Sequence, residues 1–267
     1  MASLLTNTPD TLVADVVIKS EEVLKEGDAW EEAAQRLRKA GISSAPVVDE
    51  DGFLVAILNP TDLLMEMEIE ATDDISRFSG SGGGETYFGT PLMKLVLRRC
   101  GWLVSLLMLQ SLSSVILTHF QSVIERHIVI ALFLTMLTGT AGNAGNQSSA
   151  MVIRGLATGE INSANKMRCL WREAKAALIA AVILSAASFA RVWMTPGSTW
   201  LASVAVSVAM GATVVGAVLF GTATPLLLDR FGVDPVNFAS PALATLTDVS
   251  GVLILCTVAS MLLSGHP

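Results

Sequence analysis

The pattern of apolar positions divides this chain of 267 residues into a mixed first third and a strongly apolar remainder. Five apolar segments follow one another after residue 99, at about 100–120, 128–153, 174–194, 199–224 and 240–263. Since about 20 apolar residues suffice to cross a bilayer as a helix, each segment predicts one transmembrane helix. The second and fourth are longer than one crossing needs, which allows tilted, broken or re-entrant geometry. We therefore expect an α-helical membrane protein with five transmembrane helices per protomer.

Residues 1–70 show the pattern of a small α/β domain. A β-branched run at 13–18 predicts a strand, and a helix capped by Gly27 or Asp28 is expected to run through Lys39. Two β-branched runs within 45–58, joined by an Asp-Gly turn, predict a hairpin, and a further helix is expected over 62–70. The Gly- and Ser-rich residues within 71–99 are typical of a flexible linker. A membrane domain of residues 100–267 follows.

Charge follows the same division. Residues 1–90 contain 18 acidic and 6 basic residues, a net charge of −12, whereas residues 91–267 contain 6 acidic and 11 basic residues, a net charge of +5. The acidic part argues against nucleic acid as a partner, because phosphate binding needs clustered Lys and Arg. It is compatible with divalent cations.

The basic residues of the membrane domain predict its orientation. If five helices cross the membrane, nine of these residues lie on one side, and only Arg126 and Arg191 lie on the other. Lys and Arg are enriched in cytoplasmic loops, so the amino-terminal domain is predicted to be cytosolic and the carboxyl terminus to lie outside. The protein is thus expected to be a multi-pass protein of the cell membrane, with an organellar membrane as the alternative.

Asp248 is the only ionisable side chain with a full charge in the last apolar segment, SPALATLTDVSGVLILCTVASMLL. A carboxylate in the middle of a membrane helix costs at least ~2.5 kcal/mol unless it faces water, a partner or a cation. It is therefore a candidate functional residue. The alternative is a structural carboxylate that is hydrogen-bonded to Thr245, Thr247 or Ser250.

The second apolar segment contains TGTAGNAGNQSS at residues 138–149, a composition that is unfavourable for a membrane helix. Glycines allow helices to approach closely, but close packing does not explain three neighbouring side-chain amides. Amides and loosened backbone carbonyls are tolerated where they line a water-filled path. We therefore expect Asn143, Asn146 and Gln147 to line a pore.

These residues carry a resemblance to a known family. The segment T-G-x-x-G-N-x-G-N-Q-S-S, followed by V-I-R-G-L-A-x-G-E, resembles the signature of the MgtE family of magnesium channels. The spacing from Asp234-Pro235 through Pro241 to Asp248 is similar to that family as well. The resemblance covers roughly residues 40–265. It implies a homodimer in the lipid bilayer, with the pore along the dimer axis. Asp248 then falls on the ion-selecting aspartate, with the backbone carbonyl of Ala244 in the adjacent pore wall. Thr245 lies on the same polar stripe as Ala244 and Asp248 at helical spacing, so it is expected to line the pore as well.

The amino-terminal domain resembles a single CBS motif, through A-P-V-V-D-x-x-G at 45–52. Such motifs work in pairs, so the partner must come from a second subunit, or the domain is a remnant. Asn59 stands where nucleotide-binding CBS motifs carry Ser or Thr before Asp62, which disfavours nucleotide binding.

Glu70, Asp73 and Asp74 resemble the family's acidic junction between sensor and gate, and the resemblance implies that they are regulatory Mg²⁺ ligands. The family's superhelical domain and first CBS motif have no counterpart in these 267 residues, and residues 79–84 form a Gly-Ser linker. We therefore expect Mg²⁺ transport to be retained, whereas Mg²⁺-dependent closure is in question.

The function expected from the sequence is Mg²⁺ influx. Mg²⁺ gives up its waters reluctantly, so a pore for the hydrated ion needs few direct ligands. One alternative is a secondary transporter that couples Mg²⁺ to Na⁺ or H⁺. Another is a non-conducting membrane anchor whose CBS domain binds a partner. No nucleophile–base pair indicates an enzyme, and the sequence does not distinguish Mg²⁺ from Mn²⁺, Co²⁺ or Ni²⁺.

Overall fold

The structure is a computed structural model that describes residues 22–28, 30–42, 44–59, 61–62, 64–65, 68–69, 72, 77, 88–237 and 240–263. The chain forms two compact units, residues 1–71 and residues 72–267. Each unit is described by itself below.

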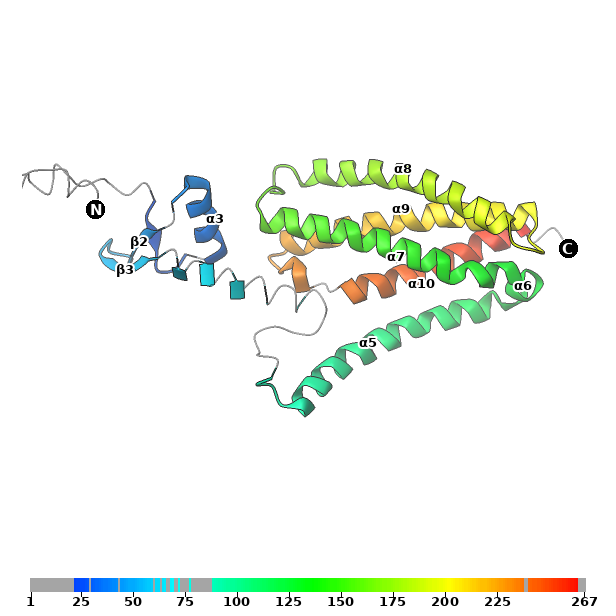
Figure 1. The fold of residues 1–267 in the computed structure, drawn as a ribbon, viewed down its shortest axis with the longest axis horizontal. Helices are drawn as coiled ribbons and strands as arrows, with labels where there is room; N and C mark the ends of the chain where they lie inside the picture. Colours follow the sequence, from blue (N-terminus) through cyan, green and yellow to red (C-terminus); the bar gives the residue numbers. More distant parts are fainter. Residues whose placement is uncertain are drawn as a thin grey trace, which may run out of the picture. The chain divides into compact units, whose positions relative to one another are not determined.

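The first unit contains a three-stranded sheet and one long helix (Figure 1). Strand β1 (Leu24–Lys25) pairs in parallel with β2 (Ala45–Val48), which pairs antiparallel with β3 (Leu54–Leu58). Helix α3 (Trp30–Ala40) lies between β1 and β2 in the chain. The predicted helix and hairpin are therefore confirmed, and Gly52 supplies the positive φ of 85° that the hairpin turn needs.

Two other predictions for this unit lie wholly or partly outside the described residues. The strand expected at 13–18 is not among them. Within the helix expected over 62–70, the described residues are helical. These residues are Asp62, Leu64, Met65, Glu68 and Ile69.

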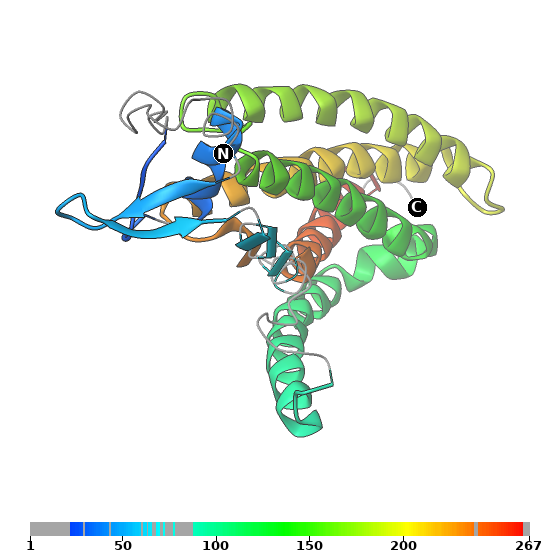
Figure 2. The same cartoon turned by 60° about the vertical axis from the view of Figure 1, so that its left-hand side comes forward.

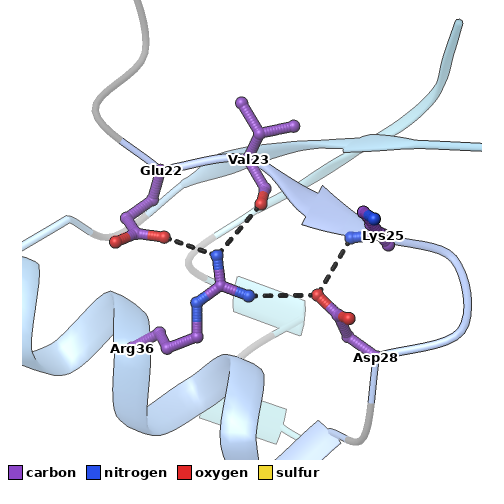
Figure 3. Close-up of polar contacts among 5 residues, drawn as sticks. All are labelled: Glu22, Val23, Lys25, Asp28 and Arg36. Carbon is purple, nitrogen blue, oxygen red and sulfur yellow. Dashed lines mark hydrogen bonds and ion pairs between the residues drawn. The ribbon is translucent and has the colours of Figure 1, made fainter. Parts of the chain in front are cut away.

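A small core and one arginine hold the first unit together. Leu24, Ala33, Leu37 and Ala45 are buried against one another. On the side of α3 nearest β1, the Arg36 guanidinium donates to Glu22 Oε2 at 2.6 Å, to Asp28 Oδ2 at 3.1 Å and to the Val23 carbonyl at 3.2 Å (Figure 3). The side chain thus ties the helix to the start of the sheet.

Among its described residues, the second unit contains five helices that are long and apolar enough to cross a membrane. They are α5 (Leu92–His119), α7 (Ile128–Ala157), α8 (Lys166–Trp193), α9 (Trp200–Arg230) and α10 (Ser240–Leu263). This confirms the predicted fold class. A short helix, α6 (Gln121–Arg126), joins α5 to α7, and a single 3-10 turn, η1 (Pro235–Asn237), precedes α10.

Several of these helices extend beyond the predicted apolar segments. Helix α5 begins at residue 92 rather than 100, and α8 begins at 166 rather than 174. Helix α9 ends at 230 rather than 224. Apolar content marks the part of a helix that lies in lipid, but the backbone remains helical through charged turns whose long side chains can reach water.

The second and fourth helices are continuous, so the breaks or re-entrant turns that their length allows do not occur. Helix α9 even contains Pro225, which cannot donate a backbone hydrogen bond to Gly221. At its end, Gly232 has a φ of 69°, and the Val233 amide donates to the Leu228 carbonyl at 2.9 Å. This is the Schellman arrangement that satisfies the last carbonyls of a helix.

Helix α9 forms the centre of the second unit. It packs against α7, α8 and α10, and α10 also packs against α7. Helix α5 packs mainly against α10, and it diverges from the other helices toward its own amino end (Figure 2). Within α5, all of which is described, only Ser113 is buried.

The two ends of the helical unit differ in charge and in aromatic content. Of the eleven basic residues within 91–267, nine belong to the beginnings of α5 and α8 and the ends of α7 and α9. These segments lie at the end of the unit where α10 also begins (Figure 1). The opposite end carries Arg126 and Arg191 together with a cluster of Phe189, Trp193 and Trp200, whose ring centroids are 4.8 to 6.4 Å apart. Aromatic residues of this kind gather at the boundary between lipid and water.

Candidate ion site in the membrane domain

Asp248 lies two turns into α10 and is half-buried. The hydroxyl groups beside it do not stabilise it. Thr245 Oγ1 donates to the Pro241 carbonyl at 2.9 Å, Thr247 Oγ1 to the Leu243 carbonyl at 2.9 Å, and Ser250 Oγ to the Thr247 carbonyl at 3.1 Å. A hydroxyl has one proton to donate, so each of these is already used within the helix. The arrangement thus disfavours the structural alternative, in which these hydroxyls hold the carboxylate.

The polar partner of Asp248 comes from another helix. Gln110 Nε2 on α5 lies 3.5 Å from Asp248 Oδ2. The sequence analysis did not identify Gln110. A signal for it was present, because Gln110 is the only side-chain amide in α5 and lies within its apolar part. An amide inside a membrane helix was the same signal that identified Asn143.

Ala244 and Thr245 occupy the turn of α10 before Asp248. Ala244 is half-buried like Asp248 and lies four residues before it, so the two residues share one side of the helix. Thr245 is only 8% exposed within the single chain, and its hydroxyl is bonded to its own helix. Its place in a pore wall therefore depends on its backbone or on a partner chain.

Gly145 lies on a different side of α7 from Asn143 and Gln147. Gly145 packs against α9 so closely that a methyl group built on Gly221 would lie 2.3 Å from the Gly145 carbonyl oxygen. Asn143 and Gln147, one turn apart, are exposed, and Asn146 is half-buried. Because α7 is an unbroken helix, the expectation of loosened backbone carbonyls at this motif is wrong. Close packing accounts for Gly145, and the amides remain candidates for a pore wall.

Among the described residues, no hydrogen bond joins Asn143 or Gln147 to Asp248. A pocket of about 340 Å³ lies further along α10, where Leu255 and Cys256 line it together with residues of α5, α6 and α7. Its lining is mainly apolar, with Gln121 and Glu125 as polar members.

A second polar cluster joins three helices near the basic end. Ser148 Oγ on α7 lies 2.7 Å from Glu173 Oε2 on α8 and 2.7 Å from Thr222 Oγ1 on α9. Ser148 and Thr222 are buried. Hydrogen bonds of this kind hold membrane helices together, because no water is available to replace them.

The loop before α10 is attached to the segment that precedes α5. Asp234 Oδ1 accepts from the Val236 amide at 2.9 Å, and its Oδ2 pairs with Arg77 Nη1 at 3.1 Å. Asp234 thus orders the η1 turn at the entrance to the helix that carries Asp248.

The expected regulatory ligands Glu70, Asp73 and Asp74 lie outside the described residues. Among the described residues, no group of three or more His, Cys, Asp or Glu side chains is arranged to hold a metal ion. At the expected nucleotide position, Asn59 Nδ2 donates to Asp62 Oδ2 at 3.3 Å, so the two side chains pair with each other.

Both units of the chain resemble known proteins. Residues 134–258 match the MgtE family of divalent cation transporters, and residues 13–69 match the CBS domain. Proteins named magnesium transporter MgtE from Thermus thermophilus, Enterococcus faecalis and Bacillus subtilis are 34%, 31% and 29% identical to the chain.

These alignments cover 98%, 98% and 96% of this chain but 58%, 57% and 56% of the respective relatives. The chain thus spans little more than half the length of the curated relatives that it matches. Its helical unit and its CBS domain both lie within the aligned part. The chain therefore belongs to the MgtE family of divalent cation transporters.

Proposed function

We propose that two copies of this chain form a channel that carries Mg²⁺ across the membrane into the cytosol, and that Asp248 of each copy selects the hydrated ion. The observation that carries this proposal is the half-buried carboxylate in α10. The neighbouring hydroxyls do not stabilise it, and its polar partner Gln110 lies 3.5 Å away, so the carboxylate still has room for water, a cation or a group of a partner chain. The names of the relatives point to Mg²⁺ as the ion.

The chemistry of the site suits a hydrated ion. Mg²⁺ keeps several waters in a near-octahedral shell at most protein sites. Two carboxylates that face each other across an axis repel, and a divalent cation between them relieves that repulsion. The carboxylates accept hydrogen bonds from the ion's waters, so the ion need not lose its shell to pass.

Two uncovered surfaces support a dimer. Helix α5 is the least packed of the five long helices, since only Ser113 is buried and it packs mainly against α10. In the first unit, Leu54, Val55 and Ile57 of β3 are exposed, although CBS motifs ordinarily cover this kind of surface by pairing. A second copy of the chain in a two-fold assembly would cover both α5 and β3. The native mass of the protein in detergent tests for this assembly.

We propose that the protein lies in the cell membrane, with the basic end of its helical unit in the cytosol. We place regulation at Glu70, Asp73 and Asp74, whose mutual repulsion a bound cytosolic Mg²⁺ offsets. Closure at high cytosolic Mg²⁺ is then the expected response, and uptake that does not respond to cytosolic Mg²⁺ would show that this sensor is inactive.

Mg²⁺ uptake into liposomes containing the purified protein tests the function. We expect Asp248→Asn to keep the fold and the native mass but to lower uptake by about tenfold or more, since hydrogen bonds to a charged group contribute about 1.5–3 kcal/mol. Asp248→Glu retains the charge at a shifted position and should conduct partially. A folded Asp248→Asn protein that transports Mg²⁺ like the wild type would show that the carboxylate is structural.

The same assay separates a channel from its alternatives. A channel moves Mg²⁺ without a Na⁺ or H⁺ gradient and gives single-channel currents. A coupled transporter requires one of those gradients. A membrane anchor gives no uptake under either condition.

A further inference from the structure

The side of α5 that faces α10 is more polar than packing requires. Its half-buried and buried positions recur every three or four residues, and three of them are Trp102, Gln110 and Ser113. The Trp102 indole N–H and the Ser113 hydroxyl are buried without a hydrogen-bond partner among the described residues. Ser113 is only 8% exposed, and it lies one turn beyond Gln110 on the same side of the helix.

A polar atom buried without a partner costs about 1–3 kcal/mol, and in a native protein it indicates a water or an ion that completes the site. Leucine at these positions would pack against α10 without that cost. The side of α5 that faces α10 thus carries two polar groups, at Trp102 and Ser113, that the packing of the single chain leaves without a partner among the described residues.

The distance between Gln110 and Asp248 is consistent with a shared ligand. Gln110 Nε2 and Asp248 Oδ2 are 3.5 Å apart, whereas hydrogen bonds to a charged group are usually about 2.7–2.9 Å long. The amide therefore restrains the carboxylate without saturating it. The carboxylate can still accept from the ion's waters, and so can the amide oxygen, because a side-chain amide both donates and accepts.

We infer that Gln110 is a second selectivity residue of the ion path, which positions the Asp248 carboxylate and accepts a hydrogen bond from the hydrated divalent cation. This inference rests on the proposed function. It adds α5 to the ion site. A neutral amide suits this role, because conduction needs a site that binds the ion weakly enough to release it.

Gln110→Leu tests the inference, with Gln121→Leu as the matched control. Gln121 is also a glutamine with a carboxylate partner, since its Nε2 lies 2.6 Å from Glu125 Oε1, but it lies on α6 away from Asp248. We expect Gln110→Leu to lower Mg²⁺ uptake by about tenfold, the factor that loss of one hydrogen bond to a charged group allows, and to change the ratio of Mg²⁺ to Ca²⁺ uptake. Gln121→Leu should leave both unchanged.

Two further variants keep the test decisive if the leucine variant folds poorly. Gln110→Glu adds a carboxylate beside Asp248, so it should lower the half-saturating Mg²⁺ concentration and also the maximal rate. Exchanging the two groups, in Gln110→Glu with Asp248→Gln, should restore part of the uptake that Asp248→Gln alone loses. An unchanged half-saturating concentration in Gln110→Glu, or no recovery in the exchanged protein, would overturn the inference.

The outcomes distinguish this inference from the proposed function. If Asp248→Asn is inactive while Gln110→Leu transports with wild-type rate and ion preference, Gln110 has no role and the function stands. If Asp248→Asn transports like the wild type, the proposed function itself is wrong.

Discussion

At the scale of single residues, the membrane domain uses its hydroxyl groups in two ways. Most donate to the carbonyl four residues earlier in the same helix, as Thr213 does to Ala209 at 2.7 Å and Thr247 to Leu243 at 2.9 Å. Such hydroxyls satisfy themselves in lipid without joining helices. Thr222 Oγ1 lies 2.8 Å from the Val218 carbonyl of its own helix and 2.7 Å from Ser148 Oγ on α7. Because Ser148 gives its one proton to Glu173, Thr222 is the donor in the contact that joins α9 to α7. Only this second kind contributes to the tertiary fold.

This difference predicts unequal costs for the same substitution on one helix. Thr222→Val removes a hydroxyl that joins α9 to α7, whereas Thr213→Val removes one that is bonded within α9. Interhelical hydrogen bonds in membrane proteins contribute about 0.6 kcal/mol on average and up to about 1.7 kcal/mol. We therefore expect Thr222→Val to lower the free energy of unfolding by that amount more than Thr213→Val, measured by denaturation with SDS in mixed micelles. Equal losses would show that the Ser148–Thr222 contact contributes no stability.

At the scale of helices, the contact between α7 and α9 depends on two glycines. A Cβ atom on Gly221 would lie 2.3 Å from the Gly145 carbonyl oxygen, but one on Gly216 of the same helix would meet nothing within 4 Å. Gly221→Ala therefore forces α7 and α9 apart, at the ~1–3 kcal/mol typical of overpacking. Gly216→Ala should be neutral or stabilising, because alanine favours a helix by about 1 kcal/mol relative to glycine. SDS denaturation compares the two, and similar unfolding free energies would contradict the close contact.

The sequence predicts these helices better than it predicts their contacts. Mean hydropathy locates all five spans, because the lipid requires apolar side chains whatever the fold. It does not show where α5 begins, since helical backbone continues through Lys94 and Arg98. It also does not show that the TGTAGNAGNQSS motif divides between a packed side with Gly145 and an open side with Asn143 and Gln147. Which helix faces which depends on tertiary packing, so the sequence marks Gln110 as an unusual amide in α5 but does not show that it faces Asp248.

At the scale of the whole molecule, a single chain leaves its most informative surfaces uncovered. Helix α5 has one buried residue, and β3 exposes three apolar side chains. Each unit therefore presents an uncovered surface of its own, and a single chain supplies one of the two carboxylates that the proposed mechanism uses. A two-fold partner would cover α5, cover β3 and supply the second carboxylate, which makes the dimer part of the proposed mechanism.

The distribution of basic residues predicts the orientation of the whole molecule. Ser163 lies in the exposed loop between α7 and α8 at the basic end, and Pro196 lies in the exposed loop between α8 and α9 at the other end. In a background without the native cysteines Cys100, Cys169 and Cys256, a membrane-impermeant maleimide added to intact cells should label Pro196→Cys and leave Ser163→Cys unlabelled. Permeabilised cells should show both labelled, which controls for accessibility. Labelling of both positions in intact cells would mean that α8 does not cross the membrane. Labelling of Ser163→Cys alone would place the basic end outside, and Mg²⁺ regulation by Glu70, Asp73 and Asp74 could then not respond to the cytosolic ion.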